Sequence, residues 1–257
     1  MLNLDAVKRA FAPGILNPDI DLAACQQALQ QRGWVVISDA LRAEVADLLR
    51  QTLTNNMPWS LAYKDSSGES RKIWAEELAQ MSAEQVVACE QQAIERASQG
   101  EFSFLYHTYM MISAYQQRRN PELVALHKLT EALNQPPWLN FMRELADDPA
   151  IIKTSAQATR YTAGQFLTTH NDSAAGELRY LAYVIQLTQD WHADWGGLLQ
   201  FMDDQRCITD TVTPQYNSIA LFKTPRLHCV SPVANYASGE RLTITGWLRG
   251  DDTAAME

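Results

Sequence analysis

The 257-residue chain contains no long hydrophobic run and little cysteine. No stretch approaches the roughly 18 apolar residues of a membrane-spanning helix, so no membrane association is expected. The four cysteines are scattered without Cys-x-x-Cys spacing, which argues against a structural zinc site and a disulfide framework. Pro13 and Pro18 interrupt the apolar residues near the N-terminus, which are too few for a signal-peptide core. A reducing, cytoplasmic location is therefore the expectation.

Positive charge is also in deficit. Lysine and arginine total 21 against 30 aspartates and glutamates, which gives a net charge of -9. Nucleic-acid affinity rests largely on clustered Lys and Arg, and no such cluster is present, so no nucleic-acid partner is expected. Apolar content of 46% and charged content of 20% are those of an ordinary globular protein. Nothing in the sequence indicates an oligomeric state.

Helical patterns dominate the first 150 residues. β-branched and aromatic residues predict two strands here, over 34–38 and 102–108. The Pro- and Gly-containing residues 1–20 are expected to be irregular, and residues 65–70 to form a polar loop. Apolar residues at helical spacing, bounded by capping and turn residues, predict helices over 22–31, 41–53, 82–100, 120–133 and 138–145.

The pattern changes at residue 151. Seven or eight short strands separated by turn residues favour a β-sandwich or jelly roll over a parallel sheet with crossover helices. The expected fold class is α+β. Residues 1–150 would form a mainly helical support packed on a barrel of residues 151–250 as one structural unit, followed by a tail over 251–257. The β-rich segments are 152–161, 165–171, 178–188, 197–202, 217–222, 227–233 and 240–248.

A candidate metal site lies in this second part. His170 and Asp172 are two residues apart, so on an extended strand their side chains point to one face and can hold one ion. His228, in a later strand-like run, is the expected third ligand. Two histidines and one carboxylate that leave other positions open are the ligand set of non-haem Fe(II) oxygenases. The chain therefore looks like an iron enzyme.

Other histidines are weaker candidates. The second His-x-Asp pair, His192 and Asp194, lies among Trp and Gly residues that predict a loop rather than a strand. His107 and His127 lie in aromatic and helical surroundings, where a structural histidine is the better interpretation.

The last predicted strand has a polar face and an apolar face. Arg241, Thr243, Thr245 and Trp247 alternate with apolar residues, so they share one side. A polar face turned inward fits a barrel whose lumen holds a ligand. Arg241 would then be buried and would need an anionic partner, such as a carboxylate held by the guanidinium fork.

Four motifs in order carry a family resemblance. The chain resembles the prolyl-hydroxylase-type branch of the 2-oxoglutarate- and Fe(II)-dependent oxygenases, well over residues 151–250 and weakly over 33–41. The resemblance implies a double-stranded β-helix, which is a jelly-roll barrel. The motifs are His170-x-Asp172, Gly196-Gly197-Leu-Leu-Gln-Phe, His228-x-Val230-x-Pro232-Val233 and Arg241-x-x-x-Thr245-x-Trp247.

The resemblance also implies a role for each matching residue. His170, Asp172 and His228 would hold Fe(II), and Arg241 would pair with the distal carboxylate of 2-oxoglutarate. The remaining matches are to positions that border or hydrogen-bond the co-substrate. At one of them the chain departs from prolyl hydroxylases, which often have a tyrosine where this sequence has glutamine. These co-substrate positions are Tyr161, Gln186 and Thr245.

The implied reaction consumes O2 and 2-oxoglutarate, hydroxylates a side chain and releases succinate and CO2. The expected substrate is a prolyl side chain of a protein or peptide, with ascorbate as the expected reductant. Two alternatives stay open, a small-molecule hydroxylase of the same superfamily and a barrel that binds metal without catalysis. The triad together with Arg241 favours catalysis, because a binding barrel has no need of both.

Overall fold

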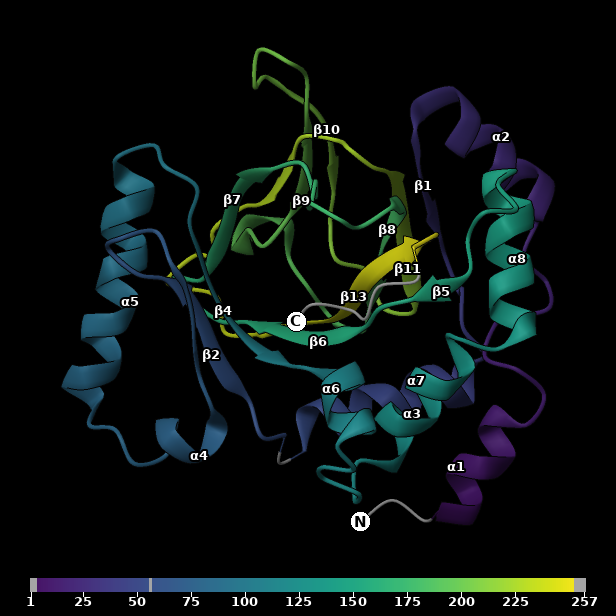
Figure 1. The fold of residues 1–257 in the computed structure, drawn as a ribbon, viewed down its shortest axis with the longest axis horizontal. Helices are drawn as coiled ribbons and strands as arrows, with labels where there is room; N and C mark the ends of the chain where they lie inside the picture. The colour runs from purple at the N-terminus through teal and green to yellow at the C-terminus, as the bar shows by residue number, and fades with distance from the viewer. Residues whose placement is uncertain (1–3, 56, 252–257) are drawn as a thin grey trace.

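The computed structural model describes residues 4–55 and 57–251. Its centre is a 13-stranded sheet that curls into a half-barrel, with helices beneath it and at both sides (Figure 1). The strands, whose pairs are all antiparallel, are β1 (Trp34–Ile37), β2 (Ser60–Lys64), β3 (Ser70–Ile73), β4 (Phe104–Tyr109), β5 (Lys153–Thr154), β6 (Gln157–Tyr161), β7 (Phe166–His170), β8 (Arg179–Gln186), β9 (Leu199–Met202), β10 (Ile208–Val212), β11 (Ser218–Lys223), β12 (His228–Val230) and β13 (Arg241–Arg249).

Strands distant in sequence are neighbours in this sheet. Its order is β1-β11-β8-β13-β6-β4-β7-β12-β9-β10, and the β2–β3 hairpin joins it through β4. The predicted α+β class with a jelly-roll barrel is confirmed. The helices are α1 (Leu4–Phe11), α2 (Leu22–Arg32), α3 (Ala43–Thr54), α4 (Ala75–Leu78), α5 (Ala83–Ser98), α6 (Met111–Gln116), α7 (Val124–Ala132) and α8 (Pro136–Ala146), with a 3-10 turn at Ala193–Trp195.

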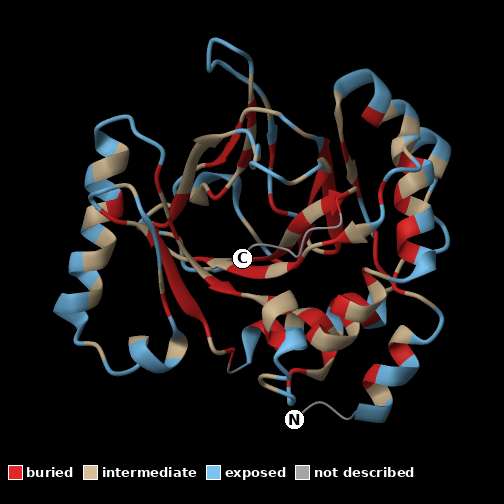
Figure 2. Ribbon diagram, viewed as in Figure 1, coloured by how far each residue is buried: buried red, intermediate tan, exposed pale blue. Residues whose placement is uncertain are grey.

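The main hydrophobic core lies between the helices and the outer face of the sheet. Leu242, Ile244 and Leu248 of β13 are buried in it, while the alternate residues of the same strand face the barrel interior. Trp138 of α8 packs edge-on against Tyr183 of β8, with ring centroids 5.7 Å apart. Figure 2 shows buried residues on the strands and on the helix faces turned toward them. The polar-inside, apolar-outside prediction for the last strand is therefore correct.

Some elements of the first half differ from the prediction. Residues 4–11 form helix α1, which buries Val7 and Ala10 against the core, whereas an irregular segment was expected. Packing of that apolar face stabilises a helix too short to be stable alone. The expected polar loop is the turn of the β2–β3 hairpin, where Asp65 accepts hydrogen bonds from the backbone N–H groups of Ser67 and Glu69.

Other boundaries agree closely with the sequence. The predicted capping box is present, since Ser82 accepts from the N–H of Gln85 and the Gln85 side chain accepts from the N–H of Ser82. Strand β10 was not predicted.

Within 4–55 and 57–251, no helix combines the length and apolarity needed to cross a bilayer. Of the expected tail, residues 252–257 lie outside the described residues.

Candidate iron centre

Three side chains converge at one end of the barrel lumen. β7 and β12 are antiparallel neighbours, and their register sets His170 directly opposite His228. Asp172 Oδ1 lies 3.3 Å from His170 Nε2, and Asp172 Oδ2 lies 3.5 Å from His228 Nε2. One ligand atom from each of the three lies within 4.8 Å of the other two. In the described part of the chain no other group of His, Cys, Asp and Glu side chains meets this spacing.

Asp172 reaches this position by a different route from the one predicted. β7 ends at His170, and Asp172 follows it with φ of 62°, in the left-handed region. The two side chains therefore meet through a turn, not through strand alternation. The guanidinium of Arg179 donates from Nη1 to the Asp172 carbonyl at 3.0 Å, and it stacks on Trp247 with 3.6 Å between its central carbon and the ring centroid. These contacts hold the turn.

Hydrogen bonding prepares both imidazoles as ligands. His170 Nδ1 lies 3.0 Å from the Thr168 carbonyl, and His228 Nδ1 lies 2.8 Å from the Arg226 carbonyl. A carbonyl only accepts, so each Nδ1 is the donor in these bonds, and Nε2, which faces Asp172, is the ring nitrogen left to bind a metal. Burial, followed by the neighbouring His170, lowers the pKa of His228 to about 4. Burial alone would raise the pKa of Asp172, but hydrogen bonding and the adjacent histidines lower it.

The lowered pKa values of His228 and Asp172 favour a neutral imidazole and an ionised carboxylate, which are the forms that bind a metal. Two imidazole nitrogens and one carboxylate suit Fe(II) with open coordination positions. The residues of the site therefore fit the predicted metal.

Arg241 occupies the same lumen. It is 2% exposed and lies on β13, and it lines with the triad a cavity of about 530 Å³. Among the described residues no carboxylate pairs with it, and its Nε has no hydrogen-bond partner. Burial lowers the pKa of its guanidinium. A buried cation of this kind calls for an anionic ligand.

Comparison with known proteins agrees with this chemistry. Residues 156–249, which contain the triad and Arg241, match the family model of the 2OG-Fe(II) oxygenase superfamily. We refer to this part of the chain, which is similar to that superfamily, as the oxygenase domain. The match implies Fe(II), 2-oxoglutarate and O2, and the lumen of the oxygenase domain holds the residue types that the metal and the dicarboxylate need.

A sequence relative and a solved structure extend the comparison of the oxygenase domain. Mouse prolyl 3-hydroxylase OGFOD1 is 28% identical over 140 residues, which is 52% of this chain but 24% of the mouse protein. The chain thus spans about a quarter of that relative. A 2OG-Fe(II) oxygenase family structure from Burkholderia pseudomallei aligns with a TM-score of 0.60 at 14% identity, over 93% of this chain and 95% of that one. The predicted resemblance to the prolyl-hydroxylase-type branch is confirmed.

Two prolyl hydroxylase structures share the fold. A Pseudomonas putida prolyl-4-hydroxylase aligns with a TM-score of 0.53 at 16% identity, over 91% of this chain and 94% of that one. A Trichoplax adhaerens prolyl hydroxylase, determined with a hypoxia inducible factor peptide, aligns with a TM-score of 0.59 at 14% identity, over 89% of both chains. The half-barrel of the oxygenase domain is thus shared with enzymes of low sequence identity.

The three predicted co-substrate residues take different positions in the oxygenase domain. Tyr161 lines the cavity and stacks on Tyr106, with ring centroids 5.1 Å apart. Thr245 also lines it, and its hydroxyl donates to the Tyr183 carbonyl at 3.0 Å. The Gln186 amide instead donates to Ser218 Oγ at 3.3 Å, away from the cavity lining. Contact of these three with 2-oxoglutarate stays a prediction, and for Gln186 it would require the side chain to rotate.

Several lumen residues were not singled out from the sequence. Tyr106 of β4 lines the cavity, and Thr159 of β6 meets Thr243 of β13 with 2.5 Å between their hydroxyl oxygens. Alternation along residues 102–108 predicted a strand at Tyr106, but only the pairing of β4 with β6 and β7 shows which face turns inward.

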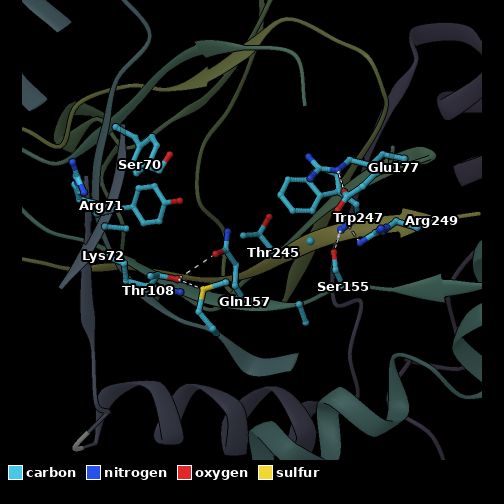
Figure 3. Close-up of a pocket in the computed structure, with 17 residues that line it drawn as sticks. Ser70, Arg71, Lys72, Thr108, Ser155, Gln157, Glu177, Thr245, Trp247 and Arg249 are labelled. Atoms are coloured by element: carbon cyan, nitrogen blue, oxygen red, sulfur yellow. Dashed lines mark hydrogen bonds and ion pairs between the residues drawn. The ribbon is translucent and has the colours of Figure 1, made fainter. Parts of the chain in front are cut away.

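A second cavity of about 320 Å³ adjoins the lumen. Tyr106, Gln157, Arg179 and Trp247 line both, so the two spaces lie side by side. The β2–β3 hairpin supplies one wall, and β13 supplies another (Figure 3). The Thr108 hydroxyl donates to Gln157 Oε1 at 3.2 Å, which leaves the amide nitrogen of Gln157 directed into the space (Figure 3).

The histidines set aside from the sequence lie apart from the triad. His192 packs on Trp195, with ring centroids 4.7 Å apart. His127 Nε2 lies 3.1 Å and 3.0 Å from the carbonyls of Arg119 and Asn120. His107 of β4 hydrogen-bonds the Gln165 side chain. His107 and His127 therefore have structural partners, as predicted, and His192 lies outside the triad.

His107 is expected to make the fold acid-sensitive. Burial, reinforced by the charge of Arg160, lowers the pKa of His107 to about 4 from its ordinary 6.5. Between these values the unfolded chain binds a proton that the folded chain does not, so stability falls as pH decreases through this window. The melting temperature of His107→Gln should therefore decline less between about pH 7 and about pH 5 than that of the wild type. Equal declines would contradict the attribution of this acid sensitivity to His107. His228 lowers the stability of both proteins by the same amount, so its contribution cancels in the comparison.

Proposed function

We propose that this chain is an Fe(II)- and 2-oxoglutarate-dependent oxygenase that hydroxylates a prolyl side chain of a protein or peptide and releases succinate and CO2. The observation that carries the proposal is one lumen that holds both a His-Asp-His triad and a buried arginine without a carboxylate partner among the described residues. The triad suits the metal, and the arginine suits the far end of a dicarboxylate.

Each residue has a role in this scheme. His170, Asp172 and His228 would hold the iron through Nε2, a carboxylate oxygen and Nε2. Arg241 would orient 2-oxoglutarate by a two-pronged hydrogen bond to its distal carboxylate. When bound, the iron supplies the redox chemistry that puts one oxygen atom of O2 into succinate and the other into the substrate hydroxyl, with ascorbate as the proposed reductant that restores Fe(II).

The protein itself would orient the reactants and exclude water. Tyr161 is 3% exposed and lies beneath Arg241, with 5.1 Å from its ring centroid to the central guanidinium carbon. This ring shields the charge-assisted hydrogen bonds from solvent and so strengthens them. Trp247 faces both cavities and separates the co-substrate space from the adjoining one.

The adjoining cavity is the proposed substrate entrance. It adjoins the cavity that the triad lines, and its walls carry the rings of Phe104, Tyr106 and Trp247. Aromatic walls suit the apolar face of a prolyl ring, while Gln157 offers an amide donor for a peptide carbonyl. The mouse relative is named a prolyl 3-hydroxylase, and the Trichoplax structure contains a peptide, which supports a peptide substrate here.

The test of the prolyl assignment uses a set of proline-containing peptides and matched peptides with alanine in place of proline. Each is incubated with the protein, Fe(II), 2-oxoglutarate, ascorbate and isotopically labelled O2. We expect one labelled oxygen on proline in at least one peptide, located by fragmentation mass spectrometry, and none on its alanine match. Equal stimulation of succinate formation by both members of a pair, without labelled proline, would contradict the assignment.

A further inference from the structure

Two glycines, Gly196 and Gly197, lie behind Arg241, the residue proposed to bind the co-substrate. Gly197 precedes β9 with φ of +61°, and a Cβ built on it would lie 3.2 Å from each of Arg241 Cδ, Trp191 Cζ2 and Val233 Cγ2. All three distances are shorter than most contacts that a Cβ atom makes. The aliphatic stem of Arg241 can therefore lie against the backbone of Gly197 only because no side chain is present there.

Hydrogen bonds hold the backbone of Gly196 and Gly197, so it cannot easily move away from Arg241. The N–H of Gly197 donates to the Ser231 carbonyl at 3.2 Å, and the Trp191 indole donates to the Gly196 carbonyl at 2.9 Å. Gly196 forms an antiparallel bridge with Val233, so close that a Cβ on Gly196 would lie 2.0 Å from the Pro232 carbonyl. Extra volume at residue 197 would therefore displace the Arg241 stem, whose open side is the lumen.

We propose that Gly197 is a positioning residue that sets the depth of the dicarboxylate site, and through it the chain length of the 2-oxo acid that the site accepts. This inference rests on the proposed function, because it assumes that Arg241 binds the distal carboxylate. With Gly197 in place, the Arg241 stem lies against the backbone, and the resulting separation between Arg241 and the triad would set the length of dicarboxylate that fits.

Small displacements matter at such a site. A fork of charge-assisted hydrogen bonds holds its partner over a narrow range of distance and angle, and each bond weakens steeply outside that range. Functional groups need placement within about 0.5 Å. A shift of a few tenths of an ångström toward the lumen would shorten the site, so it would penalise longer dicarboxylates more than shorter ones.

The experiment measures binding rather than turnover. Wild type, Gly197→Ala and Val233→Ala are titrated calorimetrically with oxaloacetate, 2-oxoglutarate and 2-oxoadipate, which differ by one methylene each, in the absence of O2 and the presence of Fe(II). Gly100→Ala is the matched control, because Gly100 also has positive φ, +78°, but has no heavy atom within 4 Å of its added Cβ. It therefore carries the backbone strain without the contact.

We expect Gly197→Ala to weaken the binding of 2-oxoglutarate about tenfold. The binding of 2-oxoadipate should weaken more and that of oxaloacetate less, while Gly100→Ala binds all three acids like the wild type. Val233→Ala removes Cγ2, one of the three atoms that close around residue 197, so it should give the Arg241 stem room to lie deeper and shift the preference toward 2-oxoadipate. If Gly197→Ala does not fold, the Val233→Ala preference decides alone. Unchanged relative affinities in the folded variants would overturn the inference, whereas a wild type that binds no 2-oxo acid would overturn the proposed function with it.

Discussion

Replacing Asp172 with alanine is expected to abolish iron binding and turnover. Asp172 supplies the negative charge of the triad, and its two oxygens face His170 and His228 at 3.3 Å and 3.5 Å. Removal of residues that only support metal ligands typically costs 10- to 100-fold in metal affinity or activity, so loss of a ligand should exceed about a hundredfold. Equilibrium dialysis against Fe(II) and succinate release measure the two effects.

The variant must be separated from a folding defect, because Asp172 has φ of 62°. Asparagine tolerates this conformation and alanine does not, so Asp172→Asn removes the charge while keeping the turn. The matched control is Asp194→Asn in the second His-x-Asp pair, which lies outside the triad. Iron binding is expected to persist in Asp194→Asn and to be lost in Asp172→Asn. Normal turnover in both Asp172 variants would contradict the triad.

The second large effect is expected at Arg241. Truncating one partner of a buried charge pair costs about 2–5 kcal/mol, and every 1.4 kcal/mol is tenfold in affinity. Arg241→Ala should therefore raise the dissociation constant for 2-oxoglutarate about thirtyfold or more, with a parallel rise in KM. The control is Arg160→Ala, because Arg160 is a half-buried arginine of β6 that pairs with Glu240 instead of lining the cavity. An unchanged 2-oxoglutarate requirement in Arg241→Ala would mean that the arginine serves the fold.

A stability measurement distinguishes the same two roles. Without ligand, Arg241 is a desolvated cation that no carboxylate of the described residues neutralises, so its charge destabilises the fold. Arg241→Met should melt at the wild-type temperature or above it, and it should lose the increase in melting temperature that 2-oxoglutarate gives the wild type. A melting temperature well below that of the wild type without ligand would assign Arg241 a structural role.

Residue types alone were enough to predict the three members of the triad, but not how they meet. His170 and His228 lie in short strand-like runs, and the register of β7 against β12 brings them together. Asp172 was predicted to share a strand face with His170, yet it lies beyond the strand end with positive φ. A single left-handed residue leaves no trace in hydrophobic periodicity, although aspartate is among the residues that tolerate it.

The barrel was predicted more accurately than its surroundings. Short β-rich runs between turn residues predicted most strands after residue 151, but β10 (Ile208–Val212) was missed because its residues are mostly polar and exposed, as suits an edge strand. Prolines 13 and 18 suggested that residues 1–20 are irregular, whereas both follow the end of α1. Residues such as proline indicate where a helix ends. They indicate less well whether tertiary packing will stabilise the helix.

The lumen depends on contacts that no local pattern contains. Tyr106 and Thr159 face the cavity because β4 pairs with β6, which in turn pairs with β13. Gln186 has the parity of a lumen residue, but its amide is engaged by Ser218 of β11, a neighbour known only from the fold. Alternation along a strand assigns each residue to one of two faces. Only the order of the strands in the sheet decides which face lines the ligand cavity.

The most direct test of the iron-oxygenase account is succinate formation by the purified protein supplied with Fe(II), 2-oxoglutarate, ascorbate and air. The account predicts succinate and CO2 in equal amounts, increased by the correct peptide and absent from Asp172→Asn. Arg241→Ala should recover part of the rate only at much higher 2-oxoglutarate concentration. A protein that binds neither Fe(II) nor 2-oxoglutarate and forms no succinate would contradict the account.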